Sequence, residues 1–287
     1  MLKVILSCFL LAIGAVALMW SKEEAGETSC CHVWDAHDQF VALASNQSFV
    51  NQHQEPDQIN FISKAGGKQI TFPTPDGQTG RGWWLPAKKK SAHYLFVFHE
   101  WWGLNDHIKA EAEKFYNDLP PVNILCLDLY DGKIATQRQE AAQLMQGLSP
   151  QRAEAIVKGA MNYAGPKANI YTIGWCMGGT WSLQAALLAG KQAKGCVIYY
   201  GMPEKDVERL KTLHTDVLGI FAGRERWISP QVVEEFAANM QRAGKQLTYK
   251  IFDADHAFAN PSNPNYAKQA AEEAYALSIN YLKERIK

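Results

Sequence analysis

The chain has 287 residues, and its 29 basic side chains balance its 29 acidic ones. This balance argues against nucleic acid as a partner, because binding to phosphates needs a surplus of Lys and Arg. Apolar residues make up 47% of the sequence and charged residues 20%, which excludes a disordered chain. Six cysteines in a chain of this length do not form the pattern of a disulfide scaffold.

Residues 1–20 form the first predicted unit. A short basic start, Met1–Lys3, is followed by 17 residues without a charge, Val4–Trp20. This pattern predicts a secretory signal peptide, and the small residues at positions 15 and 17 provide a cleavage site. The apolar run is also at the lower limit for spanning a bilayer, so an uncleaved N-terminal anchor is the alternative. We therefore expect an exported protein, periplasmic or secreted, whose only membrane contact would be that anchor.

Residues 21–64 are predicted to form a polar leader and a small helical extension that packs on the main body. They contain the adjacent pair Cys30 and Cys31, and a disulfide between neighbours is geometrically strained. Each cysteine is therefore expected to be free or, after export, to pair elsewhere. Only His32 and His37 lie near them in the sequence, too few ligands for a metal site, so no metal is predicted.

Residues 65–287 alternate strand-length apolar runs with helix-length amphipathic segments. In chain order, the predicted elements are strands 69–72, 80–85 and 94–98, helix 106–119, strand 122–127, one or two helices within 135–164, strand 170–173, helix 176–188, strands 196–200 and 217–221, helix 230–243, strand 247–252 and helix 266–286. Apolar strands between helices indicate a mainly parallel sheet covered on both faces, which is an α/β fold. Active groups of such sheets lie in loops beyond the carboxyl ends of the strands.

One of these loops carries Gly-Trp-Cys-Met-Gly at residues 174–178, between a predicted strand and a predicted helix. The spacing is typical of a nucleophile elbow, in which two glycines let a sharp turn expose the central side chain above the sheet. The central residue is Cys176, and a helix N-terminus favours its thiolate. The alternative is a buried cysteine in a glycine-containing turn.

Two further loops supply partners for this nucleophile. His256 follows the last predicted strand, where the general base of an α/β-hydrolase lies. Glu225 is the carboxylate of the loop after strand 217–221, and the chain order nucleophile, acid, base makes it the candidate acid. Its neighbours Arg224 and Arg226 leave a surface ion-pair cluster as the alternative. Any of these side chains could also have an ordinary structural role.

Several motifs occur in one order along the chain. They are His-Glu-Trp-Trp-Gly-Leu-Asn at 99–105, Leu-Asp-Leu-Tyr at 127–130, Gly-Trp-Cys-Met-Gly-Gly at 174–179, Tyr-Tyr-Gly at 199–201 and His-Ala-Phe at 256–258. With these motifs the chain resembles the dienelactone hydrolases (carboxymethylenebutenolidases), a family of the α/β-hydrolase superfamily. The resemblance covers about residue 65 to the C-terminus and implies the α/β-hydrolase fold.

The resemblance also implies roles for single residues. Cys176 would be the nucleophile and His256 the base, and Glu225 stands where the family usually has Asp. Glu100 matches a family glutamate that hydrogen-bonds the resting thiol and helps to form the thiolate. The backbone N–H groups of Met177 and Trp101 would then form the oxyanion hole.

The substrate pocket departs from the family pattern. Family members that act on dienelactone hold its carboxylate with arginines, one of them shortly after the catalytic histidine, where this chain has Asn260. Asn brings no charge, so a neutral substrate is expected unless Arg81 or Arg138 enters the pocket from elsewhere. Trp102 and Tyr130 suggest an apolar or aromatic acyl or alcohol group.

These observations predict a cysteine-dependent hydrolase of a small-molecule ester or lactone, working through a thioester acyl-enzyme with a Cys-His-Glu triad. No cofactor is expected. The alternative from another class is a non-catalytic binding protein with the α/β-hydrolase fold. A thiol-redox protein is disfavoured because the sequence has no C-x-x-C pair.

Overall fold

The computed structural model describes residues 35–287, and all of them belong to one compact unit. The predicted signal segment and the Cys30–Cys31 pair lie outside the described residues. None of the helices within 35–287 is both long and apolar enough to cross a membrane.

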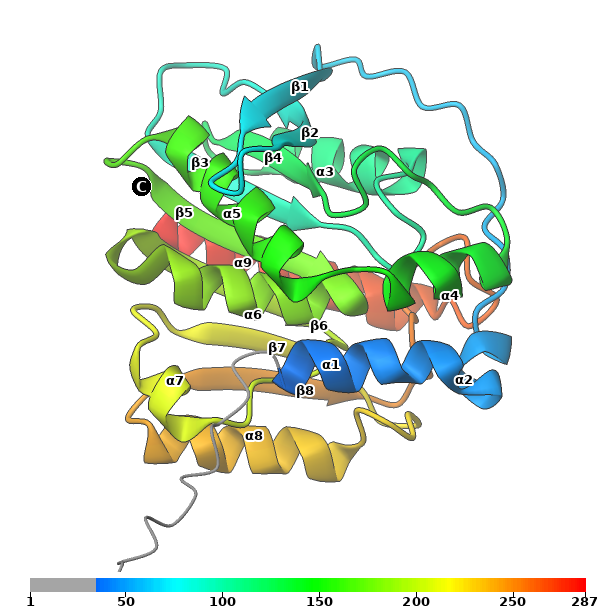
Figure 1. The fold of residues 1–287 in the computed structure, drawn as a ribbon. Coiled ribbons are helices and arrows are strands. Elements are labelled where there is room, and N and C mark those ends of the chain that lie inside the picture. The colour runs from blue at the N-terminus through cyan, green and yellow to red at the C-terminus, as the bar shows by residue number, and fades with distance from the viewer. Residues whose placement is uncertain (1–34) are drawn as a thin grey trace, which may run out of the picture. The chain divides into compact units, whose positions relative to one another are not determined.

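The centre of the fold is an eight-stranded sheet with the order β1-β2-β4-β3-β5-β6-β7-β8 (Figure 1). The strands are β1 (Lys68–Pro73), β2 (Thr79–Leu85), β3 (His93–Phe98), β4 (Asn123–Asp128), β5 (Asn169–Trp175), β6 (Ala193–Tyr199), β7 (Val217–Ala222) and β8 (Leu247–Phe252). The first two strands pair antiparallel, β2 also runs antiparallel to β4, and every other pairing is parallel. This mainly parallel sheet confirms the predicted α/β-hydrolase fold, and each predicted strand is present.

Helices cover both faces of the sheet. They are α1 (Asp35–Ala42), α2 (Gln47–Asn51), α3 (Asp106–Asp118), α4 (Arg138–Gln146), α5 (Pro150–Ala164), α6 (Met177–Ala189), α7 (Val207–Lys211), α8 (Pro230–Arg242) and α9 (Lys268–Arg285), with the 3₁₀ turns η1 (Leu43–Ser45) and η2 (Gly190–Gln192). In Figure 1, α5 and α6 lie in front of the sheet, and α3 and α9 lie behind it. The sequence analysis did not predict the short helix α7.

Local sequence signals explain where the main helices begin. Asn105, Ser149 and Ser229 each precede a helix, and the side-chain oxygen of each accepts a hydrogen bond from a backbone N–H of the first turn. Pro150 and Pro230 then stand at the first helical position, where a missing N–H costs nothing. These caps set the starts of α3, α5 and α8.

The N-terminal extension, residues 35–53, consists of α1, η1 and α2. Its helix α1 packs against α6, and the ring nitrogen Nε2 of His37 lies 3.0 Å from the carbonyl oxygen of Leu148. Asn46 caps α2 by accepting hydrogen bonds from two backbone N–H groups, and Phe40 and Phe49 are buried. The extension is therefore built into the core of the same unit as the sheet.

Candidate active site

The turn between β5 and α6 presents Cys176 in a strained backbone conformation, with φ 59° and ψ −124°. A Cβ atom on Gly174 would lie 2.0 Å from the carbonyl oxygen of Gly178, and one on Gly178 would lie 2.3 Å from that of Phe98. Both positions therefore require glycine, which is the physical reason for the spacing noted in the sequence. The thiol is 1% exposed. The prediction of an exposed side chain is thus wrong in this structure, because residues of the N-terminal extension pack against it.

Two other strand ends bring an imidazole and a carboxylate to this turn. His256 follows β8 and Glu225 follows β7, and Nδ1 of His256 lies 2.8 Å from Oε1 of Glu225. The two groups are not aligned for a hydrogen bond, and their contact is an ion pair when the imidazole is protonated. The nearby carboxylates of Asp253 and Asp255 instead pair with the exposed Arg224, at 2.8 and 3.0 Å.

The protonation of the cysteine and the histidine is coupled. Burial raises the pKa of the Cys176 thiol, while the adjacent His256 opposes this rise. Burial alone would lower the pKa of His256, but the carboxylate of Glu225 and the thiol group together raise that pKa well above its ordinary value. A thiolate at this site is therefore stabilised by its pairing with an imidazolium rather than by solvent.

The loop between β3 and α3 brings Glu100 next to the same centre. His99 fixes the loop, because its Nδ1 lies 2.6 Å from the carbonyl oxygen of Glu100 and its Nε2 accepts a hydrogen bond from the backbone of Leu129. Oε2 of Glu100 accepts a 2.5 Å hydrogen bond from the side chain of Asn260. The hydrogen bond from the resting thiol to Glu100 that the resemblance implied is replaced here by this amide contact. Burial raises the pKa of Glu100 to about 7.

The two predicted oxyanion donors come from two different loops at the ends of the strands β5 and β3. Met177 is the first residue of α6, so its N–H has no intrahelical partner, and it contacts the thiol of Cys176. Trp101 follows Glu100 in the β3–α3 loop, and its side chain is fully buried. Backbone donors at such positions can stabilise a developing oxyanion.

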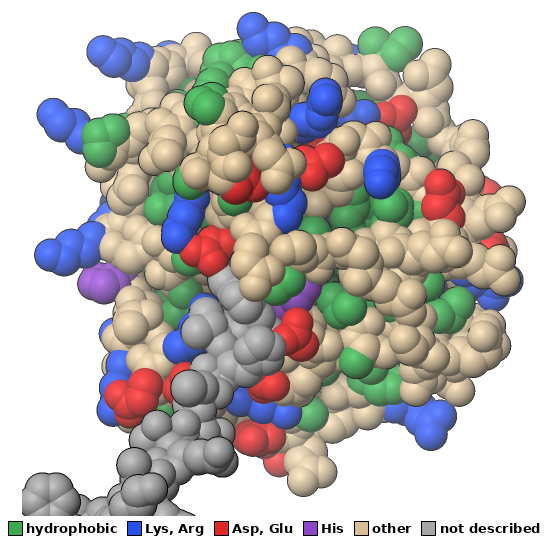
Figure 2. Space-filling model, viewed as in Figure 1, with side chains coloured by type: hydrophobic (Ala, Val, Ile, Leu, Met, Phe, Trp, Pro, Cys, Tyr) green, Lys and Arg blue, Asp and Glu red, His purple; other side chains and the backbone are tan. Residues whose placement is uncertain are grey.

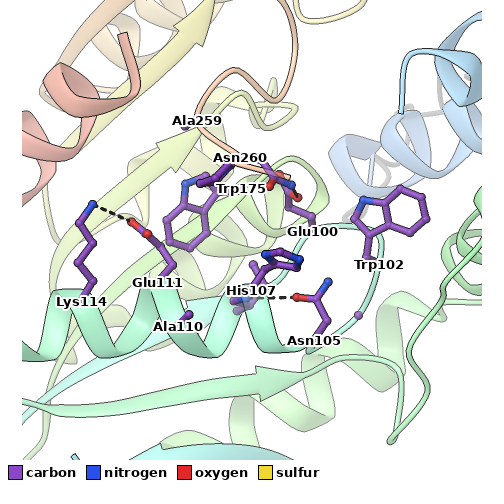
Figure 3. Close-up of a pocket in the computed structure, with 13 residues that line it drawn as sticks. Glu100, Trp102, Asn105, His107, Ala110, Glu111, Lys114, Trp175, Ala259 and Asn260 are labelled. Carbon is purple, nitrogen blue, oxygen red and sulfur yellow. Dashed lines mark hydrogen bonds and ion pairs between the residues drawn. The ribbon is translucent and has the colours of Figure 1, made fainter. Parts of the chain in front are cut away.

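A cavity of about 270 Å³ adjoins Glu100 and Asn260 (Figure 3). Its lining includes the predicted pocket residue Trp102, together with Trp175, which the sequence analysis did not select for this role. Tyr130, the third predicted pocket residue, does not line this cavity. The hydroxyl group of Tyr130 donates a hydrogen bond to Sδ of Met177 at 3.3 Å, so this tyrosine contacts the residue that follows the nucleophile.

Comparison with known proteins decides the family. The sequence model of the dienelactone hydrolase family matches residues 84–286. The chain belongs to the dienelactone hydrolase family. It is accordingly a hydrolase of carboxylic esters or lactones.

Individual relatives are distant. A carboxymethylenebutenolidase of Pseudomonas sp. is 26% identical over 173 residues, which cover 55% of this chain and 71% of that enzyme. The protein usf of Aquifex pyrophilus is 26% identical over 232 residues, covering 76% of this chain and 98% of that protein. Among solved structures, a dienelactone hydrolase-like promiscuous phosphotriesterase from metagenomic libraries matches 77% of this chain and 99% of its own, with a TM-score of 0.66 and 18% identity. At that identity the structural match supports the fold alone.

The positive side chains considered for this member of the dienelactone hydrolase family lie away from the cavity beside Glu100. Arg81 lines a separate hollow with Asp128, and Nε of Arg138 pairs with Glu55 at 2.8 Å. The cavity does contain one cation that the sequence analysis missed, Lys114. Nζ of Lys114 lies 4.0 Å from a carboxylate oxygen of Glu111 and 3.5 Å from the ring centre of Tyr275. A bound anion would therefore meet both signs of charge.

The sequence analysis also missed His53, which lies outside the part of the chain that matches the dienelactone hydrolase family. Its ring centre is 4.4 Å from that of Trp101 and 5.2 Å from that of His256. Burial, helped by the charge of His256, lowers the pKa of His53 to about 3, so the ring is neutral. No local motif marks this histidine as a site residue, because only the packing of the extension brings it to the centre.

Proposed function

We propose that this enzyme hydrolyses its ester or lactone through a thioester on Cys176, with His256 as base and Glu225 as the carboxylate partner of that base. The observation that carries the proposal is the convergence of three strand ends on one buried centre. The cysteine has the strained backbone of an elbow, and the imidazole contacts the carboxylate at 2.8 Å. This is the nucleophile, base and orienter arrangement of covalent acyl transfer.

In the proposed reaction, His256 takes the thiol proton and the sulfur attacks the acyl carbon. The N–H groups of Met177 and Trp101 stabilise the oxyanion, which collapses as the carbon–oxygen bond to the alcohol breaks. His256 returns its proton to the leaving alkoxide. A water molecule then gives a proton to His256 and attacks the thioester, and the resulting acid leaves as the thiol is protonated again.

Glu225 would hold the imidazole in one orientation and stabilise its protonated form. Glu100 would act differently from the way the resemblance implied. Its carboxylate is buried beside the reacting groups and hydrogen-bonded to Asn260. In addition to burial, its negative charge raises the pKa of the Cys176 thiol. We propose that the hydrogen bond from Asn260 holds this carboxylate off the thiol, which leaves the thiol proton for His256.

The preferred substrate is proposed to be neutral and to carry an apolar or aromatic group. The cavity next to Glu100 is lined by the apolar side chains Trp102, Trp175 and Ile108. Its one lysine is balanced by a glutamate, so no net positive charge favours a carboxylate. The interspersed Lys, Arg, Asp and Glu side chains on the face in Figure 2 are equally in keeping with a small-molecule substrate rather than a nucleic acid.

Export of the enzyme, by a cleaved signal or with an N-terminal anchor, is likewise a proposal that rests on the pattern of residues 1–20. A periplasmic or secreted location fits poorly with an internal catabolic step. Such a location fits better with an ester or lactone that the enzyme encounters outside the cytoplasm.

The test of the mechanism is to trap the acyl group. The purified protein is mixed with a chromogenic short-chain ester, quenched in acid and digested, and the peptide that contains Cys176 is examined by mass spectrometry. A mass increase equal to the acyl group on this peptide supports the thioester. Hydrolysis at full rate with the acyl group on another residue would overturn the proposal. Complete inertness toward a library of esters and lactones would favour the alternative, a binding protein.

A further inference from the structure

The N-terminal extension adds a third potential metal ligand to the catalytic pair. We propose that His53, Cys176 and His256 form a binding site for a thiophilic divalent cation of the Zn²⁺ type. This inference concerns the same centre as the proposed mechanism but does not depend on hydrolysis. A metal bound there would hold the enzyme in an inactive state.

The donor atoms are close enough for joint coordination. One ligand atom from each of the three side chains lies within 4.8 Å of the other two, and each of these side chains is at least nine-tenths buried. Tetrahedral zinc, with bonds of about 2.3 Å to sulfur and about 2.1 Å to nitrogen, places its ligand atoms roughly 3.5 Å apart. Metal binding therefore requires the ligand atoms to move closer together by up to about 1.3 Å. Two imidazoles and one thiolate leave a fourth position open for water.

The far nitrogens of both histidines have the partners that ligating imidazoles require. Nδ1 of His53 lies 2.8 Å from the carbonyl oxygen of Phe49, which can only accept a hydrogen bond. The proton of a neutral His53 therefore lies on Nδ1, and the lone pair is on Nε2. Nδ1 of His256 lies 2.8 Å from Oε1 of Glu225, in an ion-pair contact. A carbonyl or carboxylate behind each imidazole is the usual outer shell of a metal site.

Nε2 of His53 is the atom that most needs an explanation. It is buried, and it has no hydrogen-bond partner among the described residues. Buried polar atoms of native proteins nearly always have a partner, so an orphaned acceptor on a side chain that clusters with a thiol and a second imidazole points to a ligand. A metal ion would satisfy this atom.

The packing of the extension holds His53 in this position. Phe49, one turn earlier, contacts the rings of Trp101 and Trp227, with centres 5.8 and 5.3 Å away. The cap at Asn46 fixes the start of the short helix α2, which carries Phe49, and the backbone N–H of His53 just beyond this helix donates to the carbonyl oxygen of Val50 at 3.2 Å. Because these contacts are made by the extension, the third ligand is a property of this chain's added N-terminal part rather than of the region that matches the family.

Metal binding and thioester chemistry would exclude each other. Coordination forms a metal–sulfur bond and releases the thiol proton to solvent. The electron pair that would attack the acyl carbon is then shared with the metal. The metal also occupies the nitrogen of His256 that would take the thiol proton. Removal of the metal by a chelator restores both groups.

The experiment measures binding of Zn²⁺ and Co²⁺ to the full chain after dialysis against a chelator. All proteins carry Cys30→Ser and Cys31→Ser, so that this second pair of thiols cannot account for the result. We expect one metal ion per chain in competition with a chromogenic chelator. Bound Co²⁺ should show a thiolate charge-transfer band and intense visible bands typical of tetrahedral coordination.

The decisive comparison is His53→Gln against His214→Gln. His214 is exposed, and its Nδ1 lies 2.7 Å from the carbonyl oxygen of Thr212 in its own loop, so the same substitution there should leave affinity unchanged. Loss of an outer-shell partner already costs about 10- to 100-fold in affinity, so loss of the ligand His53 should cost about 100-fold or more. His53→Phe, which can pack among the same aromatic rings, serves as a second variant, and circular dichroism checks the fold of each.

Alkylation gives an independent readout. Zn²⁺ should slow the reaction of Cys176 with iodoacetamide in the parent protein but not in either variant of His53. Unchanged affinity in both variants, or loss of all binding in the background without Cys30 and Cys31, would overturn the inference. Tight binding by a protein that hydrolyses no ester would instead contradict the proposed function and leave the metal site supported.

Discussion

Replacement of Glu225 by Gln tests the charge behind the catalytic base. The substitution keeps the size and one acceptor of the side chain but removes the negative charge that faces His256. Both side chains are almost completely buried, and the two atoms are 2.8 Å apart. The imidazolium that forms during acyl transfer would therefore lose its main stabilising partner.

The magnitude follows from this distance. Two unit charges 2.8 Å apart interact by about 6 kcal/mol at an effective dielectric constant of about 20. At about 1.4 kcal/mol for each factor of ten, complete loss corresponds to roughly 10⁴-fold in rate. The amide dipole of Gln recovers part of this energy, so we expect kcat to fall by about 10³- to 10⁴-fold with a smaller change in KM.

The assay is steady-state hydrolysis of a chromogenic ester, with Asp255→Asn as the matched control. Asp255 lies on the same loop as His256, but it is exposed and pairs with Arg224. Its amide variant should retain activity within about threefold, since exposed ion pairs contribute little. A larger loss in Asp255→Asn than in Glu225→Gln would show that the acid is wrongly identified.

Cys176→Ala should lower hydrolysis by about 10³-fold or more, and a thermal melt should shift by only about 2–4 °C because one sulfur atom is lost; near-normal turnover would refute the nucleophile. Matched neutral and carboxylated lactones should differ in kcat/KM in favour of the neutral compound, since Lys114 is balanced by Glu111; a preference for the anion that weakens with salt would contradict this. Burial raises the pKa of Glu100 from 4.5 to about 7, so the native chain holds a proton that the unfolded chain loses, and stability falls as pH rises across this range. Between pH 4 and 8 this loss amounts to about 3 kcal/mol of the free energy of unfolding, measured with urea, and Glu100→Gln should abolish it. The same pH dependence in the variant and in the parent protein would contradict the raised pKa of Glu100.

The strands and the catalytic loop order were predictable because they depend on short-range patterns. A continuous apolar run such as Ile-Leu-Cys-Leu in β4 is typical of a strand buried on both faces. The close approach of the backbone at residues 174 and 178 requires glycine at both positions of the turn. The short helix α7 was missed because five residues give no periodic signal. Tyr130 was assigned to the pocket from its place in a motif, whereas its hydroxyl group points to Met177.

The sequence by itself determined the α/β fold, the elbow and the positions of the candidate base and acid, because each depends on residues that are neighbours along the chain. The tertiary structure decided which groups surround the nucleophile. Asn260 contacts Glu100 across 160 positions of the sequence, and His53 contacts His256 across 203. Such contacts follow from how the extension and the loops pack on the sheet. The residues next to His53 in the sequence do not indicate that it contacts His256. The buried surroundings of Cys176 have the same origin, since His53, which precedes the family region in sequence, lies beside the thiol in space.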